Sequence, residues 1–274
     1  TVGAFFSTPL FRYELNAVAR RGPMVGLRML VTGMLLLGLF AAFVDEFPRS
    51  EVGLGFAPGT PMPPSRSARF AETFLIVYLM VQAGLVILLT PPVVAGAILD
   101  EQERSTLDGL LASPLTDSEI VFGKFAGRIA AVWSLMAAGV PVLFLTMLFG
   151  GIDPFLLVAG TIANAIATLS LGAYSLRRAV SRGTLGEVLR PAYVWAALLT
   201  LFGGCCGCIP GLSATSPLSL IGYGAADSGQ GSFLVSFGFY AILHGILATY
   251  FYSSAVFDLR RQSDRKAGGK REVD

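Results

Sequence analysis

Residues 70–99 read FAETFLIVYLMVQAGLVILLTPPVVAGAIL and contain one charged residue, Glu72, close to the start. An α-helix needs about 20 mostly apolar residues to cross a hydrocarbon core of roughly 30 Å, so this stretch is long enough to span a membrane. Pro91 and Pro92 lack the backbone N–H that a helix interior requires. We therefore expect a transmembrane helix that is kinked or broken at the two prolines.

Five further stretches have a similar apolar character, at 24–44, 125–149, 155–176, 191–209 and 233–257. In lipid, backbone polar groups must be satisfied within the protein, so spans of this length have to be helices. Of all residues, 54% are hydrophobic and 14% are charged, against about 25% charged residues in soluble domains. The sequence therefore predicts an all-α polytopic membrane protein with about six transmembrane helices.

Lysine and arginine are distributed unevenly between the predicted loops. With the N-terminus inside, the outer loops hold only Arg49, Arg66 and Arg69, and the other 17 of the 20 basic residues lie on inner segments. Short cytoplasmic loops retain Lys and Arg during insertion, so we expect both ends of the chain in the cytoplasm. The net charge of +2 is too small to suggest a nucleic-acid partner.

The pattern divides the chain into three parts. Residues 1–23 are predicted to form an amphipathic cytoplasmic helix, since Phe6, Leu10 and Tyr13 recur at helical spacing beside basic residues that suit a lipid headgroup surface. Residues 24–258 form the transmembrane domain. Residues 259–274 are a charged cytoplasmic tail, which we expect to be disordered.

The inner loop and its flanks, residues 100–128, read DEQERSTLDGLLASPLTDSEIVFGKFAGR. A capping pattern at Ser105 begins a short helix, and Pro114 ends it. On that helix Leu107, Leu110 and Leu111 share one face. A leucine face in water is costly unless it is covered. It either docks into a groove on a partner, or packs on the protein's own helices or in the membrane interface.

This stretch resembles the loop between the second and third spans of type-2 ATP-binding-cassette (ABC) exporter permeases. The shared pattern is an acidic stretch, a Thr-Leu pair, a Leu-Leu pair, a Pro-Leu pair and a Gly-Lys pair. The family usually has Gly where Ser105 stands. By the resemblance, the residues that couple to an ATPase are Glu101, Glu103, Ser105, Thr106, Leu107, Leu110, Leu111 and Pro114.

The resemblance implies a permease subunit of an ATP-driven exporter in a bacterial inner (plasma) membrane. Its partners are then the lipid bilayer, a second permease copy or paralogue, and a separate ABC ATPase subunit that docks on loop 100–124. We expect no cofactor on this chain, because ATP is used by the partner. The chain lacks the G-x-x-x-x-G-K-[ST] phosphate loop: Phe125 follows Gly123-Lys124. A membrane scaffold that anchors a partner without transport is the alternative function.

Other polar residues do not suggest an enzyme. His244, the only histidine, lies mid-span and could be functional, but we favour a neutral imidazole bonded across helices, as for Asn164. No span contains a deep Asp, Glu, Lys or Arg, which argues against a secondary carrier. The closely spaced Cys205, Cys206 and Cys208 match no structural zinc pattern and are expected to pack as small apolar side chains, although a soft metal or a disulfide is possible chemistry.

Gly203 and Gly207 form a G-x-x-x-G pair near the end of the fifth predicted span. Helices in lipid associate by close packing, so small residues mark contact faces. The resemblance favours a dimer seam and translocation route at this face, since first and fifth spans meet across such dimers. Packing of the same face inside one subunit is the rival explanation, as is a re-entrant turn after Pro210.

Overall fold

The computed structural model describes residues 22–46, 64–103, 117–148, 150, 152–181, 184–205, 214–225 and 230–271. Within these ranges the chain folds into helices and contains no strand. The helices are α3 (Gly22–Glu46), α5 (Pro64–Glu103), α7 (Asp117–Ala137), α8 (Val140–Met147), α9 (Pro154–Ser181), α10 (Leu185–Cys205), α11 (Pro217–Ala225) and α12 (Gln230–Arg271).

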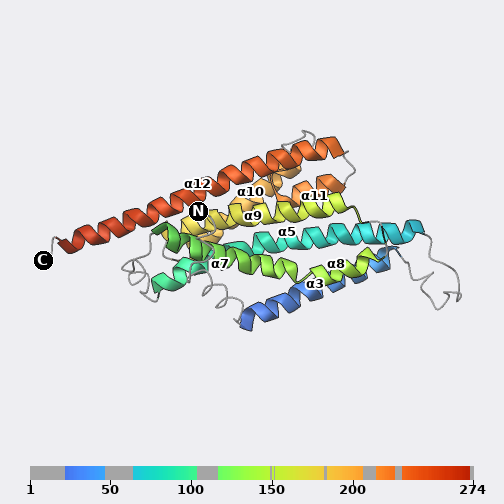
Figure 1. The fold of residues 1–274 in the computed structure, drawn as a ribbon, viewed down its shortest axis with the longest axis horizontal. Coiled ribbons are helices and arrows are strands. Elements are labelled where there is room, and N and C mark those ends of the chain that lie inside the picture. The colour runs from blue at the N-terminus through green and yellow to red at the C-terminus, as the bar shows by residue number, and fades with distance from the viewer. Residues whose placement is uncertain are drawn as a thin grey trace.

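Six spans within these helices are long and apolar enough to cross a membrane: Met24–Glu46, Ser65–Gln102, Ser118–Met147, Pro154–Ser181, Leu185–Gly203 and Gly231–Arg261. They run along the long axis of the molecule, with α9 between α5 and α12 (Figure 1). The expected all-α polytopic membrane fold is confirmed. One end of the bundle is called the basic end, because it carries Lys124, Arg128, Arg177 and Arg178. At this end α5 and α9 finish, and α7 and α10 begin.

Two groups of buried side chains hold the bundle together. The first includes Leu35 of α3, Phe74 of α5 and Tyr240 of α12. The second lies toward the basic end, includes Ile98 and Leu176, and receives no side chain from α3. Because lipid tails are as apolar as the core, the helices gain mainly from close packing and from hydrogen bonds between them.

α5 continues without interruption through Pro91 and Pro92. The sequence left a kink or a break open, and a break does not occur. Pro92 cannot donate to the carbonyl of Leu88, four residues earlier. Instead Tyr193 of α10 donates its hydroxyl to that carbonyl at 2.8 Å. A neighbouring helix thus satisfies the acceptor that proline leaves open, as membrane helices require.

The third span, in contrast, is divided. One helix was expected over 125–149, but α7 ends at Ala137 and α8 begins at Val140. Pro141 explains the position, because its ring would clash with the Ala137 carbonyl in a continuous helix. At the break Gly139 donates to the Met136 carbonyl at 3.3 Å, and Gln82 of α5 donates its side-chain amide to the same carbonyl at 3.3 Å.

A short helix that was not predicted, α11, follows α10. Ser216 caps it, since its hydroxyl accepts the backbone N–H of Ser219 at 3.1 Å, and Pro217 occupies the first helical position, where it is favoured. Just before it, Thr215 donates to the carbonyl of Leu199 at 2.6 Å. Leu199 lies more than a turn inside the end of α10, so the residue that precedes α11 lies beside α10. The turn after Pro210 lies outside the described residues, and the re-entrant alternative stays a prediction.

α12 corrects the prediction for the tail. Disorder was expected after Asp258, but α12 continues as a helix to Arg271. The charged composition after Asp258 fails to predict this because a helix that begins in the apolar span needs no new nucleus to continue. In Figure 1, α12 extends past the other helices at the basic end.

Candidate functional site

The helices that flank the predicted coupling loop are joined at its base by a buried ion pair. α5 ends at Glu103 and α7 begins at Asp117. Lys124 Nζ of α7 lies 3.0 Å from Glu101 Oε1 of α5. The Lys124 side chain is 2% exposed and the Glu101 side chain 24%. Burying an ammonium is costly unless it is paired and hydrogen-bonded, so the bond to Glu101 helps to stabilise Lys124 at this position.

A second, looser pair lies beside the first. Arg128 of α7 approaches Asp100 of α5 at 3.7 Å, and the Asp100 side chain is 45% exposed. Lys124 and Arg128 are four residues apart, so they share one face of α7. Their partners Asp100 and Glu101 are neighbours in the last turn of α5. The two pairs together connect the end of α5 to α7, the helices on either side of residues 104–116. We call these four residues the base cluster.

Of the eight coupling residues predicted from the sequence, the structure describes two. Glu101 belongs to the base cluster, and Glu103 is the last residue of α5. The other six lie outside the described residues: Ser105, Thr106, Leu107, Leu110, Leu111 and Pro114. Their role stays a prediction. Sequence reasoning missed Lys124 and Arg128 as partners of the acidic stretch, although opposite charges at the two edges of one loop were a usable signal.

The predicted seam residues divide in the same way. Gly203 is in α10 and is buried within the single chain, which agrees with packing inside the subunit. Gly207 lies outside the described residues, as do Cys206 and Cys208, and α10 ends at Cys205. The seam and the role of the cysteines therefore stay predictions.

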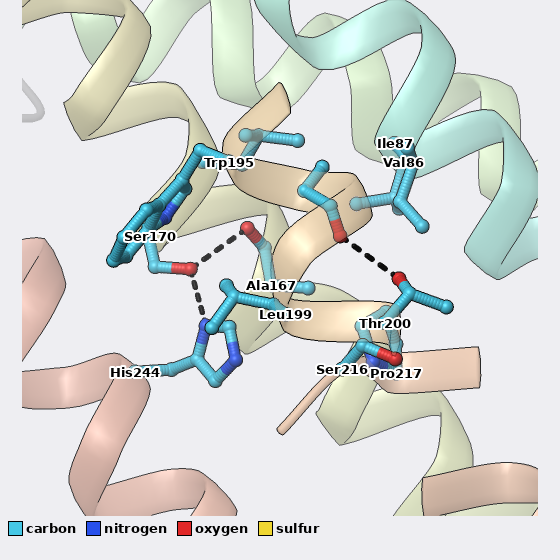
Figure 2. A pocket seen from close by; sticks show the side chains of 12 residues that line it. Val86, Ile87, Ala167, Ser170, Trp195, Leu199, Thr200, Ser216, Pro217 and His244 are labelled. Carbon is cyan, nitrogen blue, oxygen red and sulfur yellow. Dashed lines mark hydrogen bonds between the residues drawn. The ribbon is translucent and has the colours of Figure 1, made fainter. Parts of the chain in front are cut away.

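A small, mostly apolar cavity of about 30 Å³ lies between α5, α9, α10, α11 and α12. Val86, Leu171, Trp195 and Leu199 supply apolar walls. The polar groups are Ser170, Thr200, Ser216 and His244 (Figure 2). Thr200 donates to the Ala196 carbonyl of its own helix at 2.9 Å.

His244 connects three elements at this cavity. Its Nε2 lies 3.1 Å from the Thr215 carbonyl oxygen before α11, and its Nδ1 lies 2.5 Å from Ser170 Oγ of α9 (Figure 2). A carbonyl only accepts, so Nε2 carries the proton. In the neutral ring Nδ1 is then an acceptor, and the Ser170 hydroxyl, which also lies 3.1 Å from the Ala167 carbonyl of its own helix, shares its one proton between the two acceptors. The predicted bonding across helices is confirmed, and Asn164 likewise donates to the Leu79 carbonyl of α5 at 3.3 Å.

The chemistry available at the cavity is hydrogen bonding rather than catalysis. In the part of the chain described, His244 has no carboxylate partner to orient it as a base. Its bonds fix α12 and the residue before α11 to α9. The group therefore holds the helices in register.

Comparison with known proteins identifies the membrane domain. Residues 71–181 match the family model described as "ABC-2 family transporter protein". This range begins near the start of α5, contains the base cluster and its loop, and ends with α9. A search of curated proteins finds no match to the chain. With its six candidate spanning helices, the chain is similar over residues 71–181 to ABC-2 family transporter proteins, and its fold is consistent with an ABC-2 type permease.

Proposed function

We propose that this chain is the membrane subunit of an ATP-driven exporter and that loop 100–124 couples it to a separate ATPase subunit. The observation that carries the proposal is the base cluster inside the family-matched range. A loop that passes a movement of the ATPase subunit to the membrane helices has to be anchored to those helices. Without an anchor the loop would move and the helices would not. Lys124 and Glu101 provide this anchor at a place where their separation would expose a buried charge.

Under this proposal both ends of the chain, and the basic end of the bundle, face the cytoplasm. The excess of Lys and Arg at this end supports that orientation. ATP binding at the partner would move the docked loop, and the base cluster would pass the displacement to α5 and α7. α5 packs against α3, α7, α9, α10 and α11, so it is placed to distribute the motion through the bundle.

A second permease copy is proposed to cover apolar faces of α3 and α10. Leu37 and Phe40 of α3 are 70% and 65% exposed, and Leu201 of α10 is 64% exposed. Lipid alone could cover these side chains, and the resemblance favours the dimer. In a variant without native cysteines, Leu201→Cys should form an oxidative cross-link between copies, whereas Ala196→Cys, on the buried side of α10, should not. Equal cross-linking at both positions would show that the two copies do not meet at this face of α10.

The coupling proposal is tested by co-purification with the ATPase subunit. Leu110→Asp places a carboxylate on the predicted leucine face, where desolvating it costs a few kcal/mol. Ala112→Asp adds the same charge to the opposite side of the same predicted turn. We expect both variants to insert, Leu110→Asp to lose the ATPase subunit and Ala112→Asp to keep it. Full co-purification with Leu110→Asp would refute docking through the leucines, and an inserted wild-type chain that captures no ATPase would favour the scaffold.

A further inference from the structure

A hollow of about 410 Å³ at the basic end of α9 is lined by Tyr174, Arg177, Arg178 and Ser181. The two arginines lie within the last turn and a half of a helix that crosses the membrane. The hollow is separate from the base cluster and from the cavity at His244. Its lining combines two cations with hydroxyl groups, which is the chemistry of an anion site.

Both guanidinium groups are positioned by aromatic rings. The Arg177 Cζ atom lies 5.4 Å from the centre of the Tyr250 ring and 5.9 Å from that of Phe251, both on α12. Arg178 Cζ lies 5.7 Å from the Tyr174 ring centre, and Arg178 Nε donates to the Tyr174 hydroxyl at 3.3 Å. Such cation–π contacts use the faces of the guanidinium groups and leave most N–H donors at their edges available.

The charge of the arginines is not balanced by a carboxylate. Within the described ranges, neither Arg177 nor Arg178 forms an ion pair. The carboxylate at the edge of the hollow, Asp258, lies 3.4 Å from the Ser181 hydroxyl. The described lining of the hollow itself therefore carries two positive charges and no carboxylate. The preference for basic residues on the cytoplasmic side of a membrane explains why arginines occur at the basic end. It does not explain why two of them line one hollow with their guanidinium groups against aromatic rings.

The aromatic frame places the hollow at the membrane surface. Tyr174 stacks on Trp195 of α10, with ring centres 6.0 Å apart and planes at 12°, and meets Phe251 edge-on at 5.0 Å. Tyr and Trp concentrate at membrane–water interfaces, where one end of each side chain is apolar and the other is hydrated. A lipid headgroup is the anion that would lie at this level beside the bundle.

We propose that this hollow binds the phosphate of an anionic phospholipid, with Arg177 and Arg178 as the phosphate donors and Ser181 at its rim. Guanidinium groups recognise phosphate oxygens with paired N–H donors. The acyl chains would follow the apolar surfaces of α10 and α12, where Val194 is 59% exposed and Ile246 62% exposed. The site would select among lipids by the charge of the headgroup, and the apolar surfaces for the acyl chains would favour a lipid over free phosphate.

The test uses the purified full chain in detergent and measures thermal unfolding during titration with short-chain lipids. Dioctanoyl phosphatidylglycerol should stabilise the chain saturably, whereas dioctanoyl phosphatidylcholine and inorganic phosphate should not. Arg177→Gln with Arg178→Gln should weaken the apparent affinity roughly tenfold or more. Arg261→Gln is the matched control, because Arg261 is a basic residue of the same end set on the Phe257 ring at 5.4 Å but does not line the hollow; it should respond as the wild type does.

Ser181→Glu is the second variant if the double glutamine variant does not fold. Ser181 is exposed at the end of α9, and a carboxylate there would repel phosphate without removing the cation–π contacts. It should also weaken the response to phosphatidylglycerol. An unchanged response in Ser181→Glu, an equal response to phosphatidylcholine, a full response to inorganic phosphate, or an equal loss in Arg261→Gln would each overturn the proposal.

Discussion

Glu101→Gln should destabilise the chain far more than its single lost charge would suggest. The substitution keeps the size of the side chain and removes the carboxylate 3.0 Å from Lys124 Nζ. The ammonium would then remain in a site where its side chain is 2% exposed. Removing one partner of a fully buried pair costs about 3–5 kcal/mol, whereas an exposed pair is worth about 0–1 kcal/mol.

Partial exposure of the partner sets the expected size of the effect. Because Glu101 is 24% exposed, water reaches the pair, and we expect a loss of about 1–3 kcal/mol. Asp100→Asn is the matched control. It removes the carboxylate of the neighbouring pair, in which the two charged atoms lie 3.7 Å apart and the Arg128 and Asp100 side chains are 8% and 45% exposed. Because this pairing is longer and its carboxylate more exposed, the loss should be smaller than that of Glu101→Gln.

Thermal unfolding of the purified chain, followed by loss of the monodisperse species after heating, would measure these differences. Lys124→Met should cost less than Glu101→Gln, because it leaves a carboxylate that water can reach instead of a buried ammonium. Adding Lys124→Met to Glu101→Gln should recover most of the lost stability, since it removes the stranded charge. An Asp100→Asn loss as large as that of Glu101→Gln, or additive losses in the double variant, would refute this account of the base cluster.

Three further outcomes follow from the same structure. Gly139→Ala should lower the unfolding temperature, because a Cβ there would collide with the buried Leu35 side chain and overpacking costs about 1–3 kcal/mol. Gly33→Ala, where a Cβ would meet nothing within 4 Å, should not lower it, and equal shifts would contradict the close approach at the break. His244→Phe should also destabilise the folded chain, since it removes the hydrogen bond to the Thr215 carbonyl and an unpaired buried acceptor costs about 1–3 kcal/mol of stability. An unchanged unfolding temperature would show that this bond does not stabilise the fold. Single cysteines in a cysteine-free background should react with an impermeant maleimide at Ser65 in intact cells and at Ser263 only after lysis; labelling of Ser263 in intact cells would overturn the orientation.

The number and approximate positions of the spans were predictable because burial in lipid leaves few solutions. Length and apolar character suffice to locate a helix whose backbone has no other partner. The two proline sites show where this reasoning ends. Pro91 and Pro92 remain inside one helix because Tyr193, far away in the sequence, donates to the freed carbonyl of Leu88, whereas Pro141 divides its span. The difference comes from a neighbouring helix, so a local pattern could not distinguish the two cases.

The functional residues were predictable to a similar degree. The acidic stretch at Glu101 was recognisable from its motif, but its bond to Lys124 depends on how α5 and α7 pack. For His244 the sequence predicted bonding across helices without identifying Ser170 or Thr215 as the partners. The arginines of the hollow were counted only as part of the charge asymmetry. Their aromatic partners come from α9 and α12, which pack together only in the folded chain.

The central claim, that the chain couples ATP use by a partner to movement of the bundle, is tested most directly by ATP hydrolysis in reconstituted liposomes. The captured ATPase subunit would be assayed alone, with the wild-type chain, with the Leu110→Asp variant and with the Ala112→Asp variant. We predict faster hydrolysis with the wild-type and Ala112→Asp chains, and a rate with Leu110→Asp that equals the rate of the ATPase alone. The same rate in the presence and absence of the wild-type chain would contradict the claim.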